Sequence, residues 1–305
     1  MNSAVRNLRT LAPAKINWTL EVLGPREDGY HEIRSVMQTI DLCDEVKAEP
    51  SEAPIFETVD GERLGDDDLM VQGARALEGH VRRALPVRIR VQKRVPVASG
   101  LGGGSSDAAA VLRLLDRLYG LGLAVEEMAE VGAAIGSDVP FFLYGGTALV
   151  EGKGERVSSL PDVRETWFVI GVPFMFLVDK TKRMYLSLTA DHFTDGSWTQ
   201  RAVEKLRAGA AVETNERYNV FHVPAYVMYQ EPLVKLGDAM LYAGARTFEV
   251  AGSGPAISAK VDSRDEAESL VRKIRAFVIG DFHGAEANLM IARTLPAAEA
   301  TAIVE

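Results

Sequence analysis

The stretch VASGLGGGSSDAA, Val97 to Ala109, constrains this chain more than any other feature of its sequence. Four of the five residues from Gly100 to Gly104 are glycine, and apolar residues at helical spacing follow from Ala108 to Leu118. Glycine loses more backbone entropy on folding than other residues, so such a cluster requires a compensating role. Glycines let backbone N–H groups approach an anion, and the N-terminus of a following helix adds its positive end. The stretch therefore predicts a phosphate-binding loop that leads into a helix.

We expect this helix to begin near Ser105 or Ser106, whose hydroxyls can cap it or contact phosphate or metal. The alternative is a plain glycine turn into a capped helix. A turn of that kind needs only a glycine or two, so the number of glycines favours the anion site.

Two common phosphate loops do not match this stretch. A Walker A loop has a lysine after its last glycine, and a dinucleotide fingerprint that starts at Gly100 and Gly102 needs a third glycine. Ser105 occupies both positions. The preceding strand, Val87 to Lys93, alternates apolar and polar residues, whereas those folds place the loop after a continuously apolar parallel strand. We therefore expect an antiparallel sheet with one polar face, and a nicotinamide-binding oxidoreductase is disfavoured.

Length and composition narrow the class of protein. A chain of 305 residues suggests one large domain or two, and the net charge of -9 argues against a nucleic-acid partner. Cys43 is the single cysteine, which excludes a disulfide within the chain and fits a buried thiol in a cytoplasmic protein. No apolar run reaches the length of a membrane span, so no membrane partner is expected.

The chain divides at a polar connection around Pro161 to Glu165, which predicts domains over residues 1–162 and 163–305. In the first of these, Lys15 to Val22 alternates as a half-buried strand with Lys15 and Asn17 on its polar face. The acidic, glycine-containing segment from Glu49 to Asp68 is expected to be a loop.

Three ordered segments resemble the motifs of the GHMP kinases, which include galactokinase, homoserine kinase and mevalonate kinase. PVASGLGGGSSDAA resembles their phosphate-binding motif, APAKIN (12–17) their first motif and AGSGPAISAKV (251–261) their third. DGYHE (28–32) and GSDVPFFLYGGTALVEGKGE (136–155) are typical of the branch that phosphorylates 4-diphosphocytidyl-2-C-methyl-D-erythritol in the non-mevalonate isoprenoid pathway. The likeness is dense to about Glu155 and thinner afterwards.

The resemblance implies an α+β fold of two domains, the first like ribosomal protein S5 domain 2 and the second ferredoxin-like. ATP and Mg²⁺ would be the cofactors, and the acceptor would be the 2-hydroxyl of a CDP-linked small molecule. A monomer or a homodimer is expected. The alternatives are another GHMP kinase, acting on mevalonate, homoserine or a sugar, and an ATP-binding homologue without catalysis.

The resemblance assigns Asp138 as the catalytic base and Lys15 as its electrostatic partner. The residues alone favour a helix N-cap for Asp138 before Val-Pro and a solvated position on a strand for Lys15, and the resemblance reverses that order. Asn17, on the same strand face as Lys15, is implied to contact the substrate.

Aromatic residues are implied to bind the cytidine. Tyr30 would stack on the cytosine, His31 would hydrogen-bond it, and Tyr185 would supply a second ring. The alternatives are a hairpin-tip aromatic packed on its own sheet for Tyr30 and a helix residue packed inward for Tyr185.

The glycine segments are implied to hold the phosphates and close the site. Gly252, Ser253 and Gly254 of the third motif would lie beside the loop and contact substrate, although a plain β-turn also explains them. Ser106 is the candidate metal contact. The predicted contacts to ATP phosphates are Pro96, Gly100, Leu101, Gly102, Gly103, Gly104, Ser105 and Ser106.

Three segments depart from the pattern of the family. YNVFHVPA (218–225) keeps Asn219 but stands where relatives have a more acidic run of the Asn-Asp-Leu-Glu type. Asp68 stands where relatives have asparagine near the adenine, and a carboxylate lacks the donor function of an amide. Ala251 replaces a serine at the start of the third motif. We therefore expect adenine recognition to differ in detail.

Overall fold

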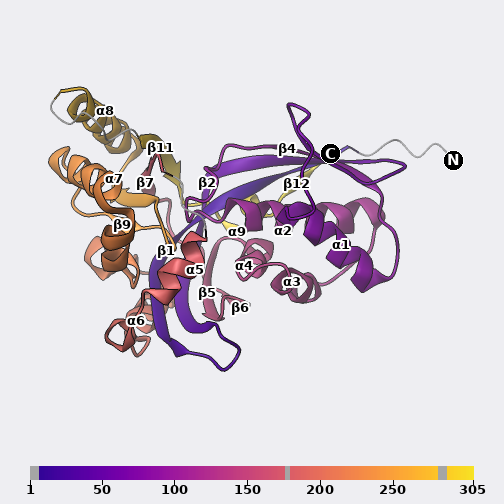
Figure 1. Cartoon of the computed structure of the whole chain (residues 1–305), viewed down its shortest axis with the longest axis horizontal. Coiled ribbons are helices and arrows are strands. Elements are labelled where there is room, and N and C mark those ends of the chain that lie inside the picture. The colour runs from indigo at the N-terminus through magenta and orange to yellow at the C-terminus, as the bar shows by residue number, and fades with distance from the viewer. Residues whose placement is uncertain (1–6, 176–178, 281–286) are drawn as a thin grey trace.

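The computed structural model describes residues 7–175, 179–280 and 287–305, whose strands form two sheets (Figure 1). Two long strands, β1 (Leu8–Pro25) and β2 (His31–Pro50), pair antiparallel at the centre of the larger sheet. The first part of β2 pairs with β5 (Thr147–Gly152) and its last part with β4 (Val87–Gln92). The shorter strands of this sheet are β3 (Ile55–Thr58), β6 (Arg156–Ser159), β8 (Tyr218–Asn219) and β12 (Ile303–Val304).

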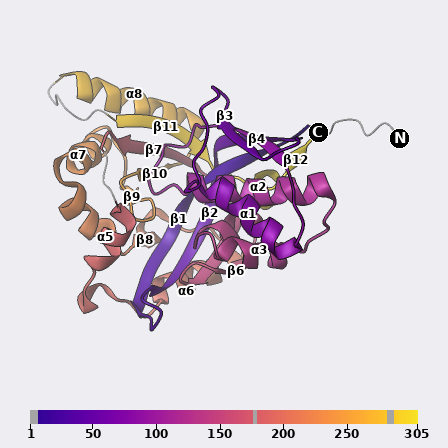
Figure 2. The same ribbon diagram turned by 45° about the vertical axis from the view of Figure 1, so that its right-hand side comes forward.

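The glycine loop leads into the central helix on the larger sheet, α2 (Gly103–Tyr119). Its buried face, which includes Val111, Leu112 and Leu115, packs on β1 and β2 and against neighbouring helices. Figure 2 shows α1 and α2 together on one side of the long strands. The other helices of this half are α1 (Leu69–Val81), α3 (Val125–Ala133) and α4 (Val139–Tyr144).

The smaller sheet has the strand order β11-β7-β10-β9 and carries two long helices, α7 (His222–Tyr242) and α8 (Arg264–Gly280). Its strands are β7 (Trp167–Pro173), β9 (Glu249–Val250), β10 (Ile257–Val261) and β11 (Ala287–Arg293). Helix α7 is interrupted at Gln230, whose φ is 47°, two positions before Pro232. The remaining helices are α5 (Lys180–Leu186), η1 (Ala190–His192), α6 (Ser197–Arg207), η2 (Thr214–Glu216) and α9 (Ala297–Ala300).

The two sheets are joined through buried contacts. Trp18 of β1 meets Phe168 of β7 edge-on, with ring centroids 5.5 Å apart. The backbone N–H of Leu295 donates to the carbonyl of Thr39 over 2.8 Å. Strands β8 and β12 both follow residue 163 in the chain, yet both pair with β1. The smaller sheet starts beyond the predicted boundary at residues 162 and 163, which itself stays a prediction.

The structure confirms one local prediction and corrects two others. Strand β4 pairs antiparallel with β2 and alternates buried and partly exposed residues, as expected, although its other neighbour, β3, runs parallel to it. The predicted loop over 49–68 was wrong in part, because β3 lies within it and pairs with β4. The predicted helix start at Ser105 or Ser106 was also wrong. Gly102 adopts a φ of 78° at the N-cap, so α2 begins at Gly103 and the serines lie inside its first turn instead of capping it.

Candidate active site

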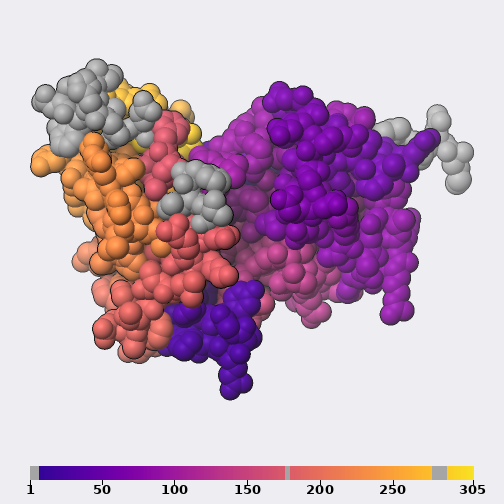
Figure 3. Space-filling view, viewed as in Figure 1, coloured from indigo at the N-terminus to yellow at the C-terminus, as the bar shows by residue number. Residues whose placement is uncertain are grey.

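A pocket of about 950 Å³ lies between the two halves of the molecule. Figure 3 shows the surface hollowed between the α1–α2 side and the α5 side. Its wall includes the glycine loop, the polar face of β1, the first residues of α1 and α5, and part of the third motif. The pocket thus brings together segments that are far apart in the sequence.

The loop presents the start of α2 to this pocket. The first hydrogen bond of the helix runs from the N–H of Ser106 to the carbonyl of Gly102, over 3.0 Å. The preceding N–H groups, at Gly103, Gly104 and Ser105, have no partner within the helix. All three residues line the pocket, so these donors and the positive helix end suit a phosphate group.

Backbone contacts hold the loop between the first and third motifs. The N–H of Lys15 donates to the carbonyl of Leu101, and the N–H of Ala256 donates to the carbonyl of Ser99, both over 2.9 Å. Gly100 has a φ of +92°, and a Cβ built on it would lie 2.2 Å from the carbonyl oxygen of Ala251. A side chain at Gly100 therefore cannot fit without moving the third motif.

Lys15 and Asn17 lie side by side on β1 and are both buried. The ammonium of Lys15 donates to Oδ1 of Asn17 over 2.9 Å, and the N–H of Gly252 donates to the same oxygen over 3.1 Å. Burial lowers the pKa of Lys15 from its ordinary value, and the carboxylate of Asp138 opposes part of this effect. Lys15 is therefore a desolvated cation whose position is fixed by the third motif.

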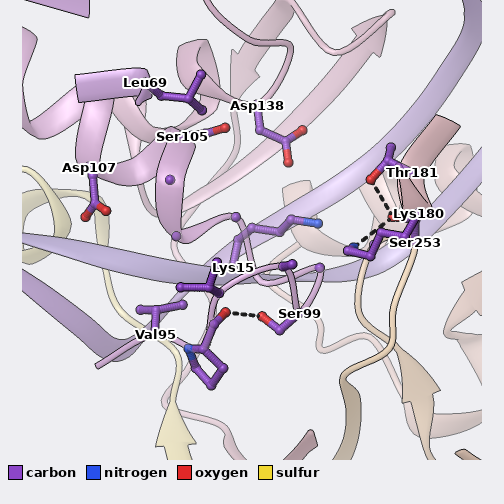
Figure 4. A pocket seen from close by; sticks show the side chains of 18 of the residues that line it. Lys15, Leu69, Val95, Ser99, Ser105, Asp107, Asp138, Lys180, Thr181 and Ser253 are labelled. Carbon is purple, nitrogen blue, oxygen red and sulfur yellow. Dashed lines mark hydrogen bonds between the residues drawn. The ribbon is translucent and has the colours of Figure 1, made fainter. Parts of the chain in front are cut away.

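Asp138 stands at the N-cap position of α4, but its side chain makes no capping hydrogen bond. The alternative role as a side-chain cap is thus not seen. Its carboxylate lines the pocket instead. In Figure 4 the ammonium of Lys15 points into the space between Asp138 and the Lys180–Ser253 side. The carboxylate and the cation therefore face one volume.

The sequence analysis missed Lys180, which lines the pocket at the start of α5. Its ammonium donates to the carbonyl of Gly254 over 2.5 Å and to Oγ of Ser253 over 3.4 Å. Burial and the positive charge of Lys15 lower the pKa of Lys180 to about 8, against the opposing effect of Asp138. The sequence did hold a signal for Lys180, because this residue stands at the start of the same helix as Tyr185, which was predicted to contact the substrate.

Tyr185 lines the pocket within a group of aromatic rings. Its ring centroid lies 5.3 Å from that of His31 and 4.8 Å from that of Phe221. Tyr30 lies apart from this group at the hairpin tip, where it is 52% exposed and the ammonium of Lys153 lies 4.6 Å from its ring centroid. The structure thus brings His31 to Tyr185, while the described lining residues include neither His31 nor Tyr30.

Some of the other predicted residues line the pocket, and some do not. Pro96, Gly100, Gly102, Gly252 and Ser253 line the pocket. The lining residues do not include Leu101, Ser106 or Gly254. Oγ of Ser106 is buried and has no hydrogen-bond partner among the described residues.

An ion cluster at the wall of the pocket supports the loop, and its residues Lys93 and Asp107 both line the pocket. Lys93 pairs with Asp44 and Asp107, and the N–H of Val95 donates to Oδ1 of Asp44 over 2.8 Å. Burial raises the pKa of Asp107 well above its ordinary value, and the ammonium of Lys93 opposes this effect. The cluster ties β2, β4 and α2 together at the point where the loop begins.

Asp68 lines the pocket at the start of α1 and caps that helix. Its Oδ1 accepts from the N–H of Met70 over 2.8 Å. An asparagine could make the same cap and would keep an amide donor for a base. Aspartate at this position therefore keeps the cap of α1 but removes a hydrogen-bond donor from the pocket.

Searches for other kinds of site gave two findings. Within the part of the chain that the structure describes, no group of three or more His, Cys, Asp or Glu side chains could hold a metal ion. None of the described helices is long and apolar enough to cross a membrane.

Comparisons with known proteins agree on one family. Residues 68–146 match the model of the GHMP kinases N terminal domain. The chain is 37% identical over 268 residues to a 4-diphosphocytidyl-2-C-methyl-D-erythritol kinase from Dehalococcoides mccartyi, which covers 88% of this chain and 94% of that protein. The kinase of the same name from Listeria monocytogenes is 37% identical over 275 residues, with coverage of 87% and 91%.

Solved structures give the same result for the fold. A crystal structure of 4-(cytidine 5'-diphospho)-2C-methyl-D-erythritol kinase matches with a TM-score of 0.76 at 29% identity, over 94% of this chain and 98% of that one. A homoserine kinase from Cytophaga hutchinsonii matches with a TM-score of 0.72 at 17% identity, over 97% and 96% of the chains. The two-domain α+β fold of the GHMP kinases is thus confirmed, and the chain belongs to the 4-diphosphocytidyl-2-C-methyl-D-erythritol kinase family.

Proposed function

We propose that this protein transfers the γ-phosphoryl group of ATP to the 2-hydroxyl of 4-diphosphocytidyl-2-C-methyl-D-erythritol, an isoprenoid precursor. The observation that carries the proposal is that one and the same pocket is lined by the start of α2, Lys15, Asp138 and Tyr185. A phosphate site, a carboxylate beside a cation and an aromatic site for a base are what this reaction requires. Family membership supports the same substrate.

The reaction depends mainly on positioning and charge stabilisation. The 2-hydroxyl oxygen attacks the γ-phosphorus, the bond from that phosphorus to the β–γ bridging oxygen breaks, and ADP leaves. Asp138 accepts the proton of the hydroxyl as the base. Lys15 stabilises negative charge on the hydroxyl oxygen and the transferring group, since a desolvated cation acts strongly at short range.

The loop supplies the donors for ATP. The free N–H groups of Gly103, Gly104 and Ser105 suit the β- and γ-phosphates, and Gly100 and Gly102 allow the close approach. Mg²⁺ takes oxygen ligands and is commonly held by one or two protein groups plus substrate phosphates, which fits a pocket whose described residues hold no group of three or more His, Cys, Asp or Glu that could bind a metal. Oγ of Ser106, which lacks a partner among the described residues, and Ser105 are the hydroxyls that would hold it. The ion would neutralise phosphate charge there.

Other residues that line or adjoin the pocket suit the acceptor substrate. Asn17 lies beside Lys15 and would contact the methylerythritol part, with Gly252 and Ser253 closing that side. Tyr185 and His31 form the ring surface against which cytosine would stack and hydrogen-bond. Tyr30, from the hairpin tip, would cover the base, and its exposed ring leaves it free to do so.

One assay tests the proposal. ADP release with Mg-ATP is measured against the CDP-linked substrate, mevalonate, homoserine and galactose. Turnover with the first alone is the expected result. Turnover with another acceptor and none with the first would transfer the assignment to a different GHMP kinase activity, and ATP binding without any turnover would indicate a homologue without catalysis.

We also propose a cytoplasmic location. It is supported by the single cysteine, Cys43, whose buried thiol has a pKa raised to about 12 by burial. A monomer or a homodimer stays a prediction.

A further inference from the structure

We propose that Lys180 binds the diphosphate that links the cytidine to the methylerythritol in the substrate, and so selects for a diphosphate-linked acceptor. This inference rests on the proposed function, since it names a role for one more residue of the same site. It begins from a cation in the pocket that none of the assigned steps uses.

The ammonium of Lys180 is fixed in place but not neutralised. It donates to the carbonyl of Gly254 and to Oγ of Ser253, both of them uncharged groups. The ion pairs found among the described residues do not include Lys180, although the residue is partly buried. A partly desolvated charge without a counter-ion is unfavourable in the empty pocket and becomes favourable when an anion binds. An ammonium has three donors, so one remains for that anion.

The position of Lys180 shows which anion it faces. It lies on α5, the same short helix as Tyr185, and its charge influences the pocket together with Lys15 and Asp138. Figure 4 shows Lys180 and Ser253 across the pocket from Asp138. A substrate with its base on Tyr185 and its hydroxyl at Asp138 must carry its diphosphate between them. Lys180 is a cation on the α5 side of that path; Lys182 of the same helix also lines the pocket, but no hydrogen bond to the third motif is found for it among the described residues.

The phosphates of ATP have other donors in this pocket and do not require Lys180. The free N–H groups that suit these phosphates lie at the start of α2, and Figure 4 shows Lys180 on the other side of the pocket from Ser105 in that helix. Lysine commonly binds phosphate as a compact point charge. We therefore assign Lys180 to the acceptor substrate and not to the nucleotide donor.

The test compares binding of CDP and cytidine by calorimetry in wild type and Lys180→Met, without ATP. Wild type should bind CDP about tenfold more tightly than cytidine, as expected for one charge-assisted contact. Lys180→Met should lose this preference with cytidine binding unchanged, and Lys180→Arg should keep most of it. Arg183→Met is the matched control, because Arg183 lies on the same helix, is exposed and is not among the pocket-lining residues.

Kinetics separate the two proposals. Lys180→Met should raise KM for the CDP-linked substrate about tenfold and leave KM for ATP unchanged. An unchanged preference for CDP over cytidine in Lys180→Met, or an effect on KM for ATP alone, would overturn the role of Lys180. Absence of turnover in wild type would instead overturn the proposed function, and the binding arms would still decide what Lys180 does.

Discussion

Lys15 and Asn17 share one oxygen with the third glycine motif: Oδ1 of Asn17 accepts from the ammonium of Lys15 at 2.9 Å and from the N–H of Gly252 at 3.1 Å. The amide thereby orients a buried cation and joins β1 to a segment more than two hundred residues away. Asn219 secures the same segment, because its side chain donates to the carbonyls of Val250 and Gly252 over 2.7 Å and 2.8 Å. The reacting groups are thus positioned by contacts between the two halves of the molecule.

Asp138→Asn should retain ATP binding and lose most turnover. The amide keeps the size of the side chain but cannot accept the proton, and general bases contribute about 10²–10⁴-fold to rate. The measurement is kcat with the CDP-linked substrate, beside calorimetric binding of an ATP analogue. Asp60→Asn, at an exposed turn outside the pocket, is the control and should match wild type. Near wild-type turnover in Asp138→Asn would refute the catalytic role.

Gly100→Ala should destabilise the protein and weaken ATP binding. Its Cβ would lie 2.2 Å from the carbonyl oxygen of Ala251 at a φ of +92°. The free energy of unfolding should fall by about 1–3 kcal/mol, the usual range for strain at a special backbone position. Urea denaturation and ATP binding are the measurements.

Gly104→Ala is the matched variant in the same loop. A Cβ there would lie 3.5 Å from Cδ1 of Leu69, which is ordinary contact, and the backbone is helical. Alanine is favoured over glycine in a helix by about 0.5–1 kcal/mol, so the protein should be as stable as wild type or more stable. Equal losses of stability in the two variants would contradict the close approach of the loop to the third motif.

The pH profile of kcat/KM for the CDP-linked substrate should decline as pH rises through about 8, because the pKa of Lys180 is lowered to about 8. The lysine is charged below that pH and loses its charge above it, so attraction for the diphosphate is lost on the alkaline side. The other charged groups that influence Lys180, Lys15 and Asp138, are the same in wild type and in the variant, so a difference between the two profiles reports on residue 180. In Lys180→Arg the guanidinium stays charged, so the decline should move to higher pH. Identical profiles would show that another group titrates.

Asp68→Asn should lower KM for ATP by a few-fold and leave the free energy of unfolding unchanged. Either side chain can cap α1 through Oδ1, but only the amide adds a donor to the pocket. Asp68→Ala is the contrasting variant, and loss of the cap should cost about 1 kcal/mol. An increase in KM for ATP in Asp68→Asn would mean that the carboxylate itself serves the nucleotide.

Local patterns predicted the elements that depend on neighbours in the sequence. The alternation in β4 and the apolar spacing in α2 each predicted the element that forms, because both record a buried face. The prediction failed at the start of α2, where the left-handed conformation of Gly102 ends the loop earlier than the serines suggested. It also failed at β3, whose four residues pair with β4, a strand that follows helix α1 in the chain.

The sequence by itself determined the glycine loop, the strand face shared by Lys15 and Asn17, and the resemblance that pointed to Asp138. It could not place Lys180 in the pocket, because that position depends on how α5 packs on α7. Nor could it bring His31 to Tyr185 while leaving Tyr30 exposed at the hairpin tip. Tertiary structure decided these points because the contacts join distant segments, and burial, which lowers the pKa of Lys15 and Lys180, exists only once both halves have packed.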